Sequence, residues 1–380
     1  MDGVSKAFEE LPMKSSFLSI SSLTKRFGDV TVLNDVSFEL GKGECVALVG
    51  PSGCGKTTTL RCIGGLEYAD SGSIRLEGKT LSEGPHAVVP QDRQMGMVFQ
   101  SYSVWPHLTV FENVAFGLKL RRVSRSEIEK RVRDCLSLMN IGHLAERKSF
   151  QLSGGQLQRV ALARTLVVEP KVVLFDEPLS NLDAQLRAHM RTEIRALLKR
   201  LNMSAVYVTH DQSEASVVAD RTAVMHQGGI KQIGAWKDLY FVPSSRFVAE
   251  FMGAGNLLDG SVKGTEGNRV IVDVKGTTLQ IDEDRCAFEP GIGSAITVYA
   301  PREAIILSAL GQSGITGRVT QVLPGPSIFE VSVDTPLGTL MSVKVATDDI
   351  PQVGEQCSVA LLPAHLSGFP FEPDHVTEAH

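Results

Sequence analysis

A short apolar run followed by a glycine-rich loop limits this chain to few folds. Cys45–Val49 is continuously apolar, which is typical of a strand buried on both faces of a sheet. The next eight residues, Gly50–Thr57, fit the pattern G-x-x-x-x-G-K-[ST]. Glycines let such a loop fold around a polyphosphate with its N–H groups pointing inward, and the following helix adds positive charge at its N-terminus. The pattern predicts a phosphate-binding loop between a central strand and a helix.

Within this loop, Lys56 is expected to reach the β- and γ-phosphates, and Thr57 to offer its hydroxyl to Mg²⁺. The alternative is a glycine-rich turn that matches the pattern by accident. The loop by itself predicts a bound polyphosphate with Mg²⁺. The residues expected to hold the nucleotide here are Gly50, Pro51, Ser52, Gly53, Cys54, Gly55, Lys56, Thr57 and Thr58.

Two carboxylates follow a second apolar strand. Val172–Phe175 leads directly into Asp176 and Glu177, at the strand end where ligands of open α/β sheets collect. We expect Asp176 to hold Mg²⁺, directly or through water, and Glu177 to polarise the attacking water as a general base. The alternative is an ordinary acidic strand end.

Strands and helices alternate beyond this point. A helical pattern spans residues 182–201, Ala205–Val208 reads as a buried strand, and another helical pattern spans residues 212–219. This alternation predicts an α/β fold with a mainly parallel sheet. Residues 106–160 predict a helical subdomain, in which Ser124 and Glu127 are spaced as a capping box.

An antiparallel β subdomain is predicted near the start of the chain. Residues 17–40 contain short β-branched runs, with turns expected at Gly28-Asp29 and at Asn34-Asp35. The last part of the chain is also β-rich, since its apolar runs are short and bounded by glycine, which suggests one or two small β-barrels. These runs include residues 270–274, 295–299, 329–333 and 358–362.

Charge divides the chain into two parts. The net charge is −5, but residues 256–380 hold 7 Lys and Arg against 16 Asp and Glu, a balance of −9. Repulsion from phosphates argues against nucleic acid binding by this acidic part. We therefore expect a flexible leader over residues 1–16, a nucleotide-binding domain over residues 17–250 and a β-domain over residues 251–380.

A third motif gives a family resemblance. Leu152–Gln156 reads Leu-Ser-Gly-Gly-Gln and is similar to the signature motif of ATP-binding subunits of ABC transporters. The resemblance covers nearly the whole chain. It implies that Ser153, Gly154, Gly155 and Gln156 open a helix and cap the ATP held by the opposite subunit, in a head-to-tail homodimer with two ATPs at its interface. The helix that this motif opens is expected over Gln158–Thr165.

Four further positions resemble functional residues of this family. Phe27 looks like the aromatic that stacks on adenine, although an aromatic here is equally consistent with a core residue. Gln100 resembles the glutamine that touches Mg²⁺. Asp183 lies in a segment similar to the loop that crosses the dimer interface, and His210 resembles the histidine that contacts the γ-phosphate.

The resemblance also implies partners. The acidic β-domain resembles the OB-like regulatory domain of maltose, polyamine and ferric-iron importer ATPases, which favours import. The expected partners are transmembrane permease subunits, which hold the chain at the cytoplasmic face of the cell membrane, and indirectly a periplasmic or surface substrate-binding protein. The aromatic-rich segment 101–108 is expected to receive the permease, the alternative being an ordinary core loop.

The cargo and one rival class complete the expectations. Residues 251–258 and 101–107 look closest to the ferric-iron, polyamine and phosphonate branch, and ferric iron is favoured over polyamine, phosphonate or sugar. Soluble ABC ATPases of DNA repair or translation carry the same motifs. However, repair types carry a coiled coil or zinc insertion and translation types carry two ATPase modules, neither of which is visible here.

Overall fold

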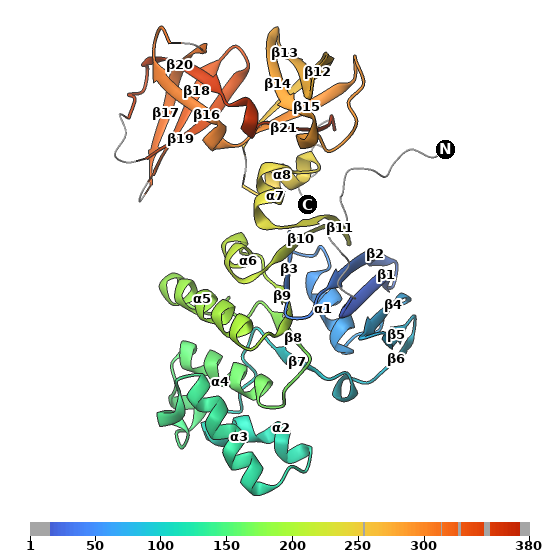
Figure 1. The fold of residues 1–380 in the computed structure, drawn as a ribbon. Helices are drawn as coiled ribbons and strands as arrows, with labels where there is room; N and C mark the ends of the chain where they lie inside the picture. Colours follow the sequence, from blue (N-terminus) through green and yellow to red (C-terminus); the bar gives the residue numbers. More distant parts are fainter. Residues whose placement is uncertain (1–15, 254, 313, 326–327, 346–349, 373–380) are drawn as a thin grey trace. The chain divides into compact units, whose positions relative to one another are not determined.

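The chain was analysed as a computed structural model, which describes residues 16–253, 255–312, 314–325, 328–345 and 350–372. The expected leader, residues 1–16, lies outside the described residues except for Ser16. The chain divides into two compact units, and the boundary between them in the sequence falls between Ile233 and Gly234. Figure 1 labels the elements of both units.

The described part of the first unit contains two sheets. The smaller sheet has the strand order β2-β1-β4-β5-β6 and is antiparallel. This confirms the expected antiparallel β subdomain. Its strands are β1 (Leu18–Phe27), β2 (Val30–Leu40), β4 (Ser71–Leu76), β5 (Lys79–Glu83) and β6 (His86–Ala87).

The larger sheet has the order β11-β10-β3-β9-β8-β7, and β10, β3, β9, β8 and β7 run parallel to one another. The mainly parallel α/β fold is thus confirmed. The strands are β3 (Cys45–Val49), β7 (Met95–Val98), β8 (Val172–Asp176), β9 (Ser204–Val208), β10 (Arg221–His226) and β11 (Gly229–Gly234).

Both faces of the parallel sheet are buried, as its apolar strands require. Along β8, Val173 and Phe175 pack into a core shared with the helices. The alternate residues Val172 and Leu174 pack into a second core shared with the antiparallel sheet. Because side chains alternate across a strand, one apolar run supplies both cores. The sheet end that carries Asp176 is therefore held rigidly.

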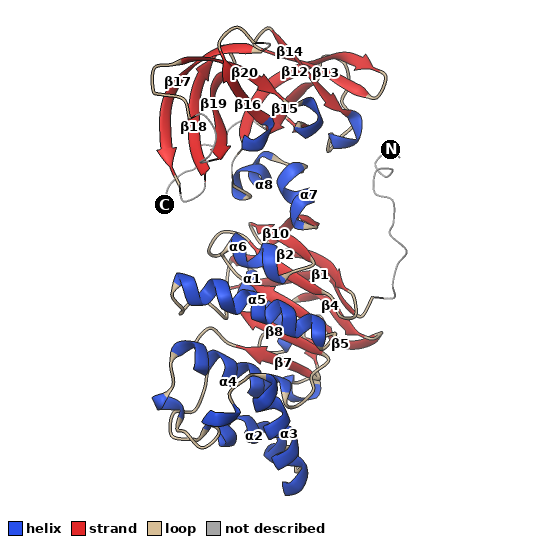
Figure 2. Cartoon of the chain, turned by 60° about the vertical axis from the view of Figure 1, so that its left-hand side comes forward, coloured by secondary structure: helices blue, strands red, loops and turns tan. Residues whose placement is uncertain are grey.

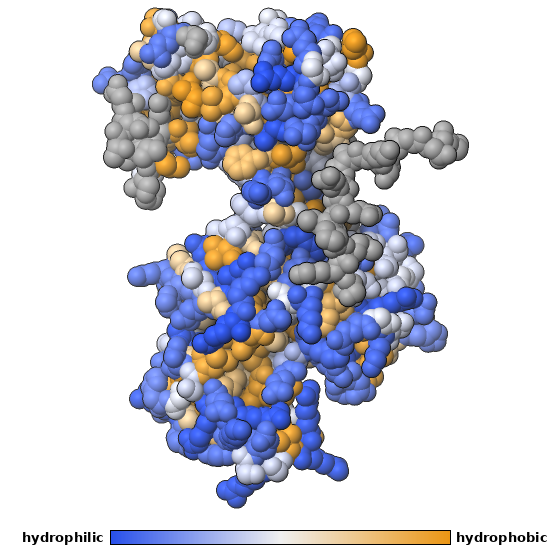
Figure 3. Space-filling model, viewed as in Figure 1, coloured by the Kyte–Doolittle hydropathy of each residue, from blue (hydrophilic) through white to orange (hydrophobic). Residues whose placement is uncertain are grey.

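Helices α2 to α6 gather on one face of this sheet and beyond its β7 edge (Figure 2), whereas α1 packs Leu60 and Ile63 into the core on the other face. On the face drawn in Figure 3, hydrophobic residues gather between α4 and α5, where the helical core lies. The helices of this unit are α1 (Lys56–Gly64), α2 (Val110–Leu120), α3 (Arg125–Leu138), α4 (Gly154–Leu166), α5 (Ala184–Arg200) and α6 (Gln212–Val218).

Three local expectations need correction. The turn expected at Asn34-Asp35 is wrong: β2 runs through it, and Asp35 adopts φ 55° where the pairing with β1 shifts register, as in a β-bulge. The signature helix begins at Gly154 rather than Gln158, because Ser153 caps it.

The third correction is the capping box at Ser124. The Ser124 hydroxyl accepts a hydrogen bond from the Glu127 N–H, but the Glu127 carboxylate pairs with Arg131 at 2.6 Å. An i,i+4 ion pair has replaced the second half of the box. A complete box forms instead at Thr109 and Glu112, which begins α2.

The second unit is all-β apart from two short helices and 3-10 turns in its described residues, which confirms the expected β-rich part. Its sheets are antiparallel, with orders β14-β13-β12-β15-β21 and β16-β20-β17-β18-β19. The strands are β12 (Asn256–Glu266), β13 (Arg269–Val274), β14 (Thr277–Asp282), β15 (Ala295–Ala300), β16 (Ile305–Ala309), β17 (Ile315–Pro324), β18 (Ile328–Thr335), β19 (Gly338–Val345), β20 (Gln356–Leu361) and β21 (Ser367–Pro370).

The two helices of this unit are α7 (Trp236–Phe241), which precedes the boundary expected at residue 250, and α8 (Arg246–Phe251), which ends one residue beyond it. They belong to the second unit because they pack on its strands: Ala249 joins a small core with Tyr299 and Phe369. Arg246 also pairs with Asp259 at 2.9 Å. The boundary at residue 250 remains a prediction, and the compact units divide 17 residues earlier.

Candidate functional site

The phosphate loop connects the end of β3 to the start of α1. Gly53 and Gly55 adopt φ values of 82° and 106°, which side chains other than glycine rarely tolerate. A Cβ on Gly50 would lie 2.2 Å from the Met225 carbonyl oxygen and 2.7 Å from Cys54 Sγ. The loop can therefore hold this tight path only with glycine at these positions.

Lys56 points back into the loop. Its Nζ donates hydrogen bonds to the carbonyl oxygens of Gly50 and Pro51, both at 2.8 Å, and its side chain is buried. It also lies 3.8 Å from Cys54 Sγ. The ammonium group is thus held by the same loop whose N–H groups bind phosphate, so it is positioned for an anion that enters there.

Thr57 and Asp176 meet across the site, although 119 residues separate them. The Thr57 hydroxyl donates to Asp176 Oδ1 at 3.0 Å. Burial raises the pKa of the Asp176 carboxyl, and the hydrogen bond from Thr57 only partly opposes this. A hydroxyl and a carboxylate are hard oxygen donors of the kind that Mg²⁺ binds, and a cation would offset the effect of burial. The residues present fit a magnesium ion.

Glu177 collects contacts from three separate segments. Its N–H donates to the Val208 carbonyl at 3.0 Å, which holds the residue beside β9 with φ 44°. Its Oε2 lies 3.2 Å from His210 Nδ1 and 3.5 Å from Gln100 Nε2. The structure therefore brings Gln100, Glu177 and His210 together on one carboxylate oxygen.

A cavity of about 370 Å³ lies over the phosphate loop. Phe27 lies at its rim and is 48% exposed, with Lys25 Nζ 4.9 Å from its ring centre, so the alternative of a core residue is excluded. Gly50, Pro51 and Cys54 shape the loop without lining the cavity. The lining residues are Phe27, Val32, Ser52, Gly53, Gly55, Lys56, Thr57, Thr58 and Glu177.

The signature residues do not line this cavity. Ser153 and Gln156 form a reciprocal capping box at the start of α4, and Ser153 is exposed. A Cβ on Gly155 would lie 3.1 Å from Leu186 Cδ2, so glycine lets α4 pack closely on α5. Asp183 caps α5 by accepting from the Leu186 N–H at 2.9 Å. Within one chain, these residues form a separate surface.

Sequence reasoning missed two residues that organise the loop after Gln100. Asn113 is fully buried on α2; its Oδ1 accepts from the Trp105 N–H at 2.9 Å, and its Nδ2 donates to the Trp105 carbonyl at 3.0 Å. Arg164 on α4 donates to the carbonyls of Tyr102 and Ser103. Neither belongs to a motif; a polar residue on an otherwise apolar helix face was the only available signal.

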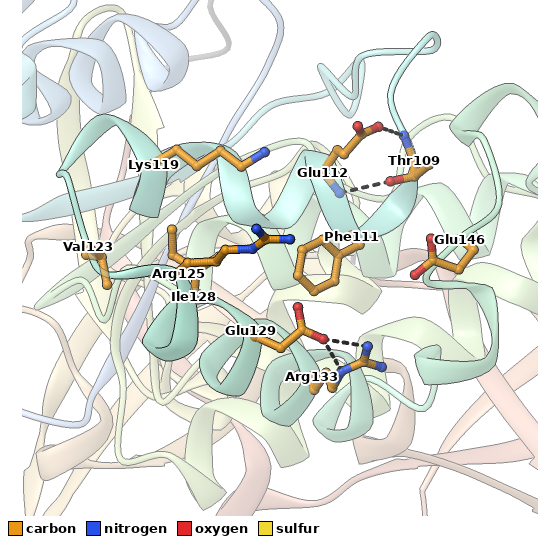
Figure 4. A pocket seen from close by; sticks show the side chains of 10 residues that line it. All are labelled: Thr109, Phe111, Glu112, Lys119, Val123, Arg125, Ile128, Glu129, Arg133 and Glu146. Atoms are coloured by element: carbon orange, nitrogen blue, oxygen red, sulfur yellow. Dashed lines mark hydrogen bonds and ion pairs between the residues drawn. The ribbon is translucent and has the colours of Figure 1, made fainter.

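A second cavity, of about 660 Å³, lies between α2 and α3 and contains none of the expected ATP-site residues. Lys119 and Arg125 extend toward the Phe111 ring, and Glu129 pairs with Arg133 (Figure 4). The cavity is lined by Thr109, Phe111, Glu112, Lys119, Val123, Arg125, Ile128, Glu129, Arg133 and Glu146.

In the described residues, no helix is both long and apolar enough to cross a membrane.

The cavity over the phosphate loop, at the carboxyl ends of parallel strands and beside a carboxylate, defines a phosphate-loop ATPase. Residues 33–180 match the ABC transporter family. The chain belongs to the ATP-binding subunits of ABC transporters, in the group of ferric-iron and polyamine import proteins, so the resemblance inferred from the sequence is confirmed. It is an ATPase that binds ATP.

Three relatives illustrate this membership. The Fe(3+) ions import ATP-binding protein FbpC of Escherichia coli is 42% identical over 350 residues, covering 92% of this chain and 97% of the relative. FbpC of Rhizobium etli is 41% identical, covering 89% and 93%. The spermidine/putrescine import ATP-binding protein PotA of Rubrobacter xylanophilus is 41% identical, covering 80% of each chain.

Proposed function

We propose that two copies of this chain bind two Mg-ATP molecules head to tail and hydrolyse them to drive ferric iron through a membrane permease. The observation that carries the hydrolytic part is the convergence of Gln100 and His210 on the Glu177 carboxylate, next to the phosphate loop. The Thr57 hydroxyl, within the phosphate loop, and the buried Asp176 carboxylate supply a pair of oxygen donors beside this cavity.

Each residue has a distinct role in this proposal. Lys56 releases the Gly50 and Pro51 carbonyls and binds the β- and γ-phosphates, while Phe27 stacks on adenine. Thr57, Asp176 and Gln100 would hold Mg²⁺, which when bound would supply charge neutralisation at the phosphates.

Proton transfer falls to Glu177. Its carboxylate accepts a proton from the attacking water, and His210, 3.2 Å away, orients the carboxylate and contacts the γ-phosphate. This role requires water to reach Oε2 from the cavity, and Glu177 does line that cavity.

The second copy completes each site. Ser153 is exposed at the N-terminus of a 13-residue helix, where backbone N–H groups favour an anion. Because Ser153–Gln156 lie outside the cavity of their own chain, we propose that they cap the ATP of the partner. Asp183 lies at the start of the neighbouring α5 and crosses the same interface.

The cargo and location follow from the relatives. Several relatives that are 40–42% identical are named for Fe(3+) import, and one that is 41% identical is named for spermidine and putrescine import. We propose ferric iron, delivered by a periplasmic or surface binding protein to a permease that holds this chain at the cytoplasmic face of the cell membrane. The β-domain then acts in regulation.

Glu177→Gln tests hydrolysis and dimerisation together. The variant should bind Mg-ATP and persist as a closed dimer by light scattering, with turnover reduced by about 10²–10⁴-fold. Glu129→Gln, a change in an exposed ion pair on α3, is the control and should behave as the parent. A Glu177→Gln chain that stays monomeric under saturating Mg-ATP would count against the dimer; unchanged hydrolysis would count against the base.

Uptake by cells tests the cargo. The chain is expressed with its permease and binding protein, and radiolabelled Fe³⁺ and radiolabelled spermidine are supplied separately. Iron should accumulate in parent cells and not in Glu177→Gln cells. Accumulation of spermidine alone would replace ferric iron with a polyamine while leaving the ATPase assignment intact.

A further inference from the structure

Arg164 lies in the last turn of α4 and contacts the loop that follows Gln100. Its guanidinium donates one hydrogen bond to the Ser103 carbonyl and another, at 3.1 Å, to the Tyr102 carbonyl. Its Cζ also lies 4.9 Å from the centre of the Trp105 ring. One side chain thus contacts three residues of a single loop, 59 to 62 positions earlier in the sequence.

The loop needs such a contact. Tyr102 and Ser103 have consecutive φ values of 60° and 50°, and neither is glycine. Left-handed backbone at two successive side-chain-bearing residues is unfavourable unless surrounding groups hold it. Arg164 binds the carbonyls of both residues, and charged donors form stronger hydrogen bonds than neutral ones.

This loop is connected directly to the catalytic carboxylate. Gln100 lies two residues before Tyr102, and its side chain reaches Glu177 Oε2. The Gln100 carbonyl accepts from Asn181 Nδ2 at 2.8 Å, which fixes the start of the loop to the segment before Asp183. At its other end, Trp105 packs against Phe116 of α2, with ring centres 4.3 Å apart and the ring planes tilted by 42°.

Arg164 also belongs to the helix that begins with the signature residues. Ser153 caps the start of α4, and Arg164 occupies its last turn. Thr165, the next residue, donates to the Met97 carbonyl of β7 at 3.2 Å. The loop after Gln100 and strand β7 are thus both hydrogen-bonded to the last turn of α4, the helix that begins at Ser153–Gln156.

We propose that Arg164 is a positioning residue that couples the loop from Gln100 to Trp105 to the signature helix, so that nucleotide at Glu177 changes the environment of Trp105. The inference rests on the proposed role of Gln100. It differs from a purely structural role, in which Arg164 would only satisfy carbonyl groups and leave catalysis untouched in a folded variant.

Trp105 supplies the readout because the chain has only two tryptophans, Trp105 and Trp236. Trp236→Phe leaves Trp105 as the single emitter in the full-length chain. In this background we compare Arg164→Ala, Arg164→Lys and the control Arg121→Ala. Arg121 also donates from this helical region to a backbone carbonyl, that of Val168 at 3.0 Å, but does not contact the loop.

Three measurements are made on each protein: Trp105 emission during titration with Mg-ATP, binding of a fluorescent ATP analogue, and steady-state hydrolysis. In Arg164→Ala the nucleotide-induced emission change should be lost, and kcat should fall about tenfold while KM changes less than about threefold. Arg164→Lys should recover part of both, since it keeps the charge but loses the paired donors. Arg121→Ala should match the background protein.

The inference is overturned if folded Arg164→Ala keeps the emission change and kcat of the background protein. It is overturned equally if Trp105 of the background protein does not respond while the analogue binds. Should Arg164→Ala fail to fold, Arg164→Lys decides, because full activity and full response in that variant contradict the need for a paired donor. Failure of the ATP site itself is distinguishable, since the analogue would then not bind the background protein.

Discussion

In the first unit the most consequential buried polar group, Asp176, lies at the carboxyl end of a parallel strand; in the second, Asn256 lies between two antiparallel sheets. Within the described part of the chain, Asp176 accepts one side-chain hydrogen bond, from Thr57, which itself lines the nucleotide cavity. Asn256 binds the Ala300 carbonyl and both backbone groups of Met341. Parallel strands leave their loops at one edge, where incompletely paired groups can meet a ligand. In the antiparallel second unit, the polar side chain of Asn256 is instead fully hydrogen-bonded and joins strands to one another.

The largest effect of a substitution is expected in the phosphate loop of the first unit, where polar groups meet the ligand. Lys56→Ala should reduce ATP turnover by at least about a hundredfold, because it removes a buried charge next to the developing negative charge of the phosphates. The measurement is phosphate release at saturating Mg-ATP. Lys79→Ala, on an exposed position of β5, is the matched control. Turnover that survives in Lys56→Ala would remove the catalytic role of the loop.

Two truncations compare the units directly. Residues 1–233 should form a soluble fragment that still hydrolyses ATP, since every lining residue of the cavity lies within it. Residues 1–255 should hydrolyse ATP too but aggregate more, because α8 loses the partners of Val248 and Ala249, which are 0% and 1% exposed in the full chain. Solubility and phosphate release measure this.

Greater solubility of the 1–255 fragment would favour the boundary predicted from the sequence. Insolubility of both fragments would contradict a division into independent units.

Motifs made of neighbouring residues could be predicted from the sequence, because their geometry is local. The phosphate loop, and Asp176 with Glu177 after β8, needed only a strand and a turn to be placed. The meeting of Gln100 and His210 at Glu177 could not be derived in that way. It depends on β7, β8 and β9 lying side by side, and only the resemblance to a family identified the two residues.

The sequence-based predictions failed where the same residues favour two different local structures. Asn34-Asp35 is a favoured turn pair, yet a positive φ inside a paired strand makes a bulge instead. Contacts such as that of Arg164 with Ser103 join residues 61 positions apart and leave no periodic trace. The boundary near residue 250 stays a prediction; the packing of Ala249 on Tyr299 and Phe369 accounts for α8 being in the second compact unit.

A smaller effect is expected in the second unit. Asn256→Ala should lower the free energy of unfolding of that unit by about 2–4 kcal/mol, because it leaves a Met341 N–H and two carbonyls without their partner. Phosphate release should stay at the parent value. Urea unfolding measures the stability, and Asn268→Ala, at an exposed position between β12 and β13, is the control. A loss of turnover without a loss of stability would contradict the structural role of Asn256.

The smallest effect is expected for Asp220. It tests whether a buried polar group serves catalysis or stability according to its position in the fold rather than according to its unit. Asp220 belongs to the first unit but lies away from the cavity, where it accepts from Arg195 at 2.8 Å, Lys199 at 2.7 Å and the Cys45 N–H at 2.9 Å. Burial raises its pKa, but these donors outweigh burial and lower it below the ordinary value of 3.8. The carboxylate therefore stabilises the fold above that value, and this contribution is lost as the pH falls through the folded pKa.

Asp220→Asn should cost about 1–2 kcal/mol of unfolding free energy at pH 7, and the difference from the parent should shrink as the pH is lowered below about 4. Urea unfolding between pH 7 and pH 3 measures it, with the exposed Asp29→Asn as the control. A cost that stays constant across this range would mean that shape rather than charge holds Asp220 in place. A pH-dependent cost with unchanged ATP turnover would place it with Asn256, as a group that completes the fold inside the catalytic unit.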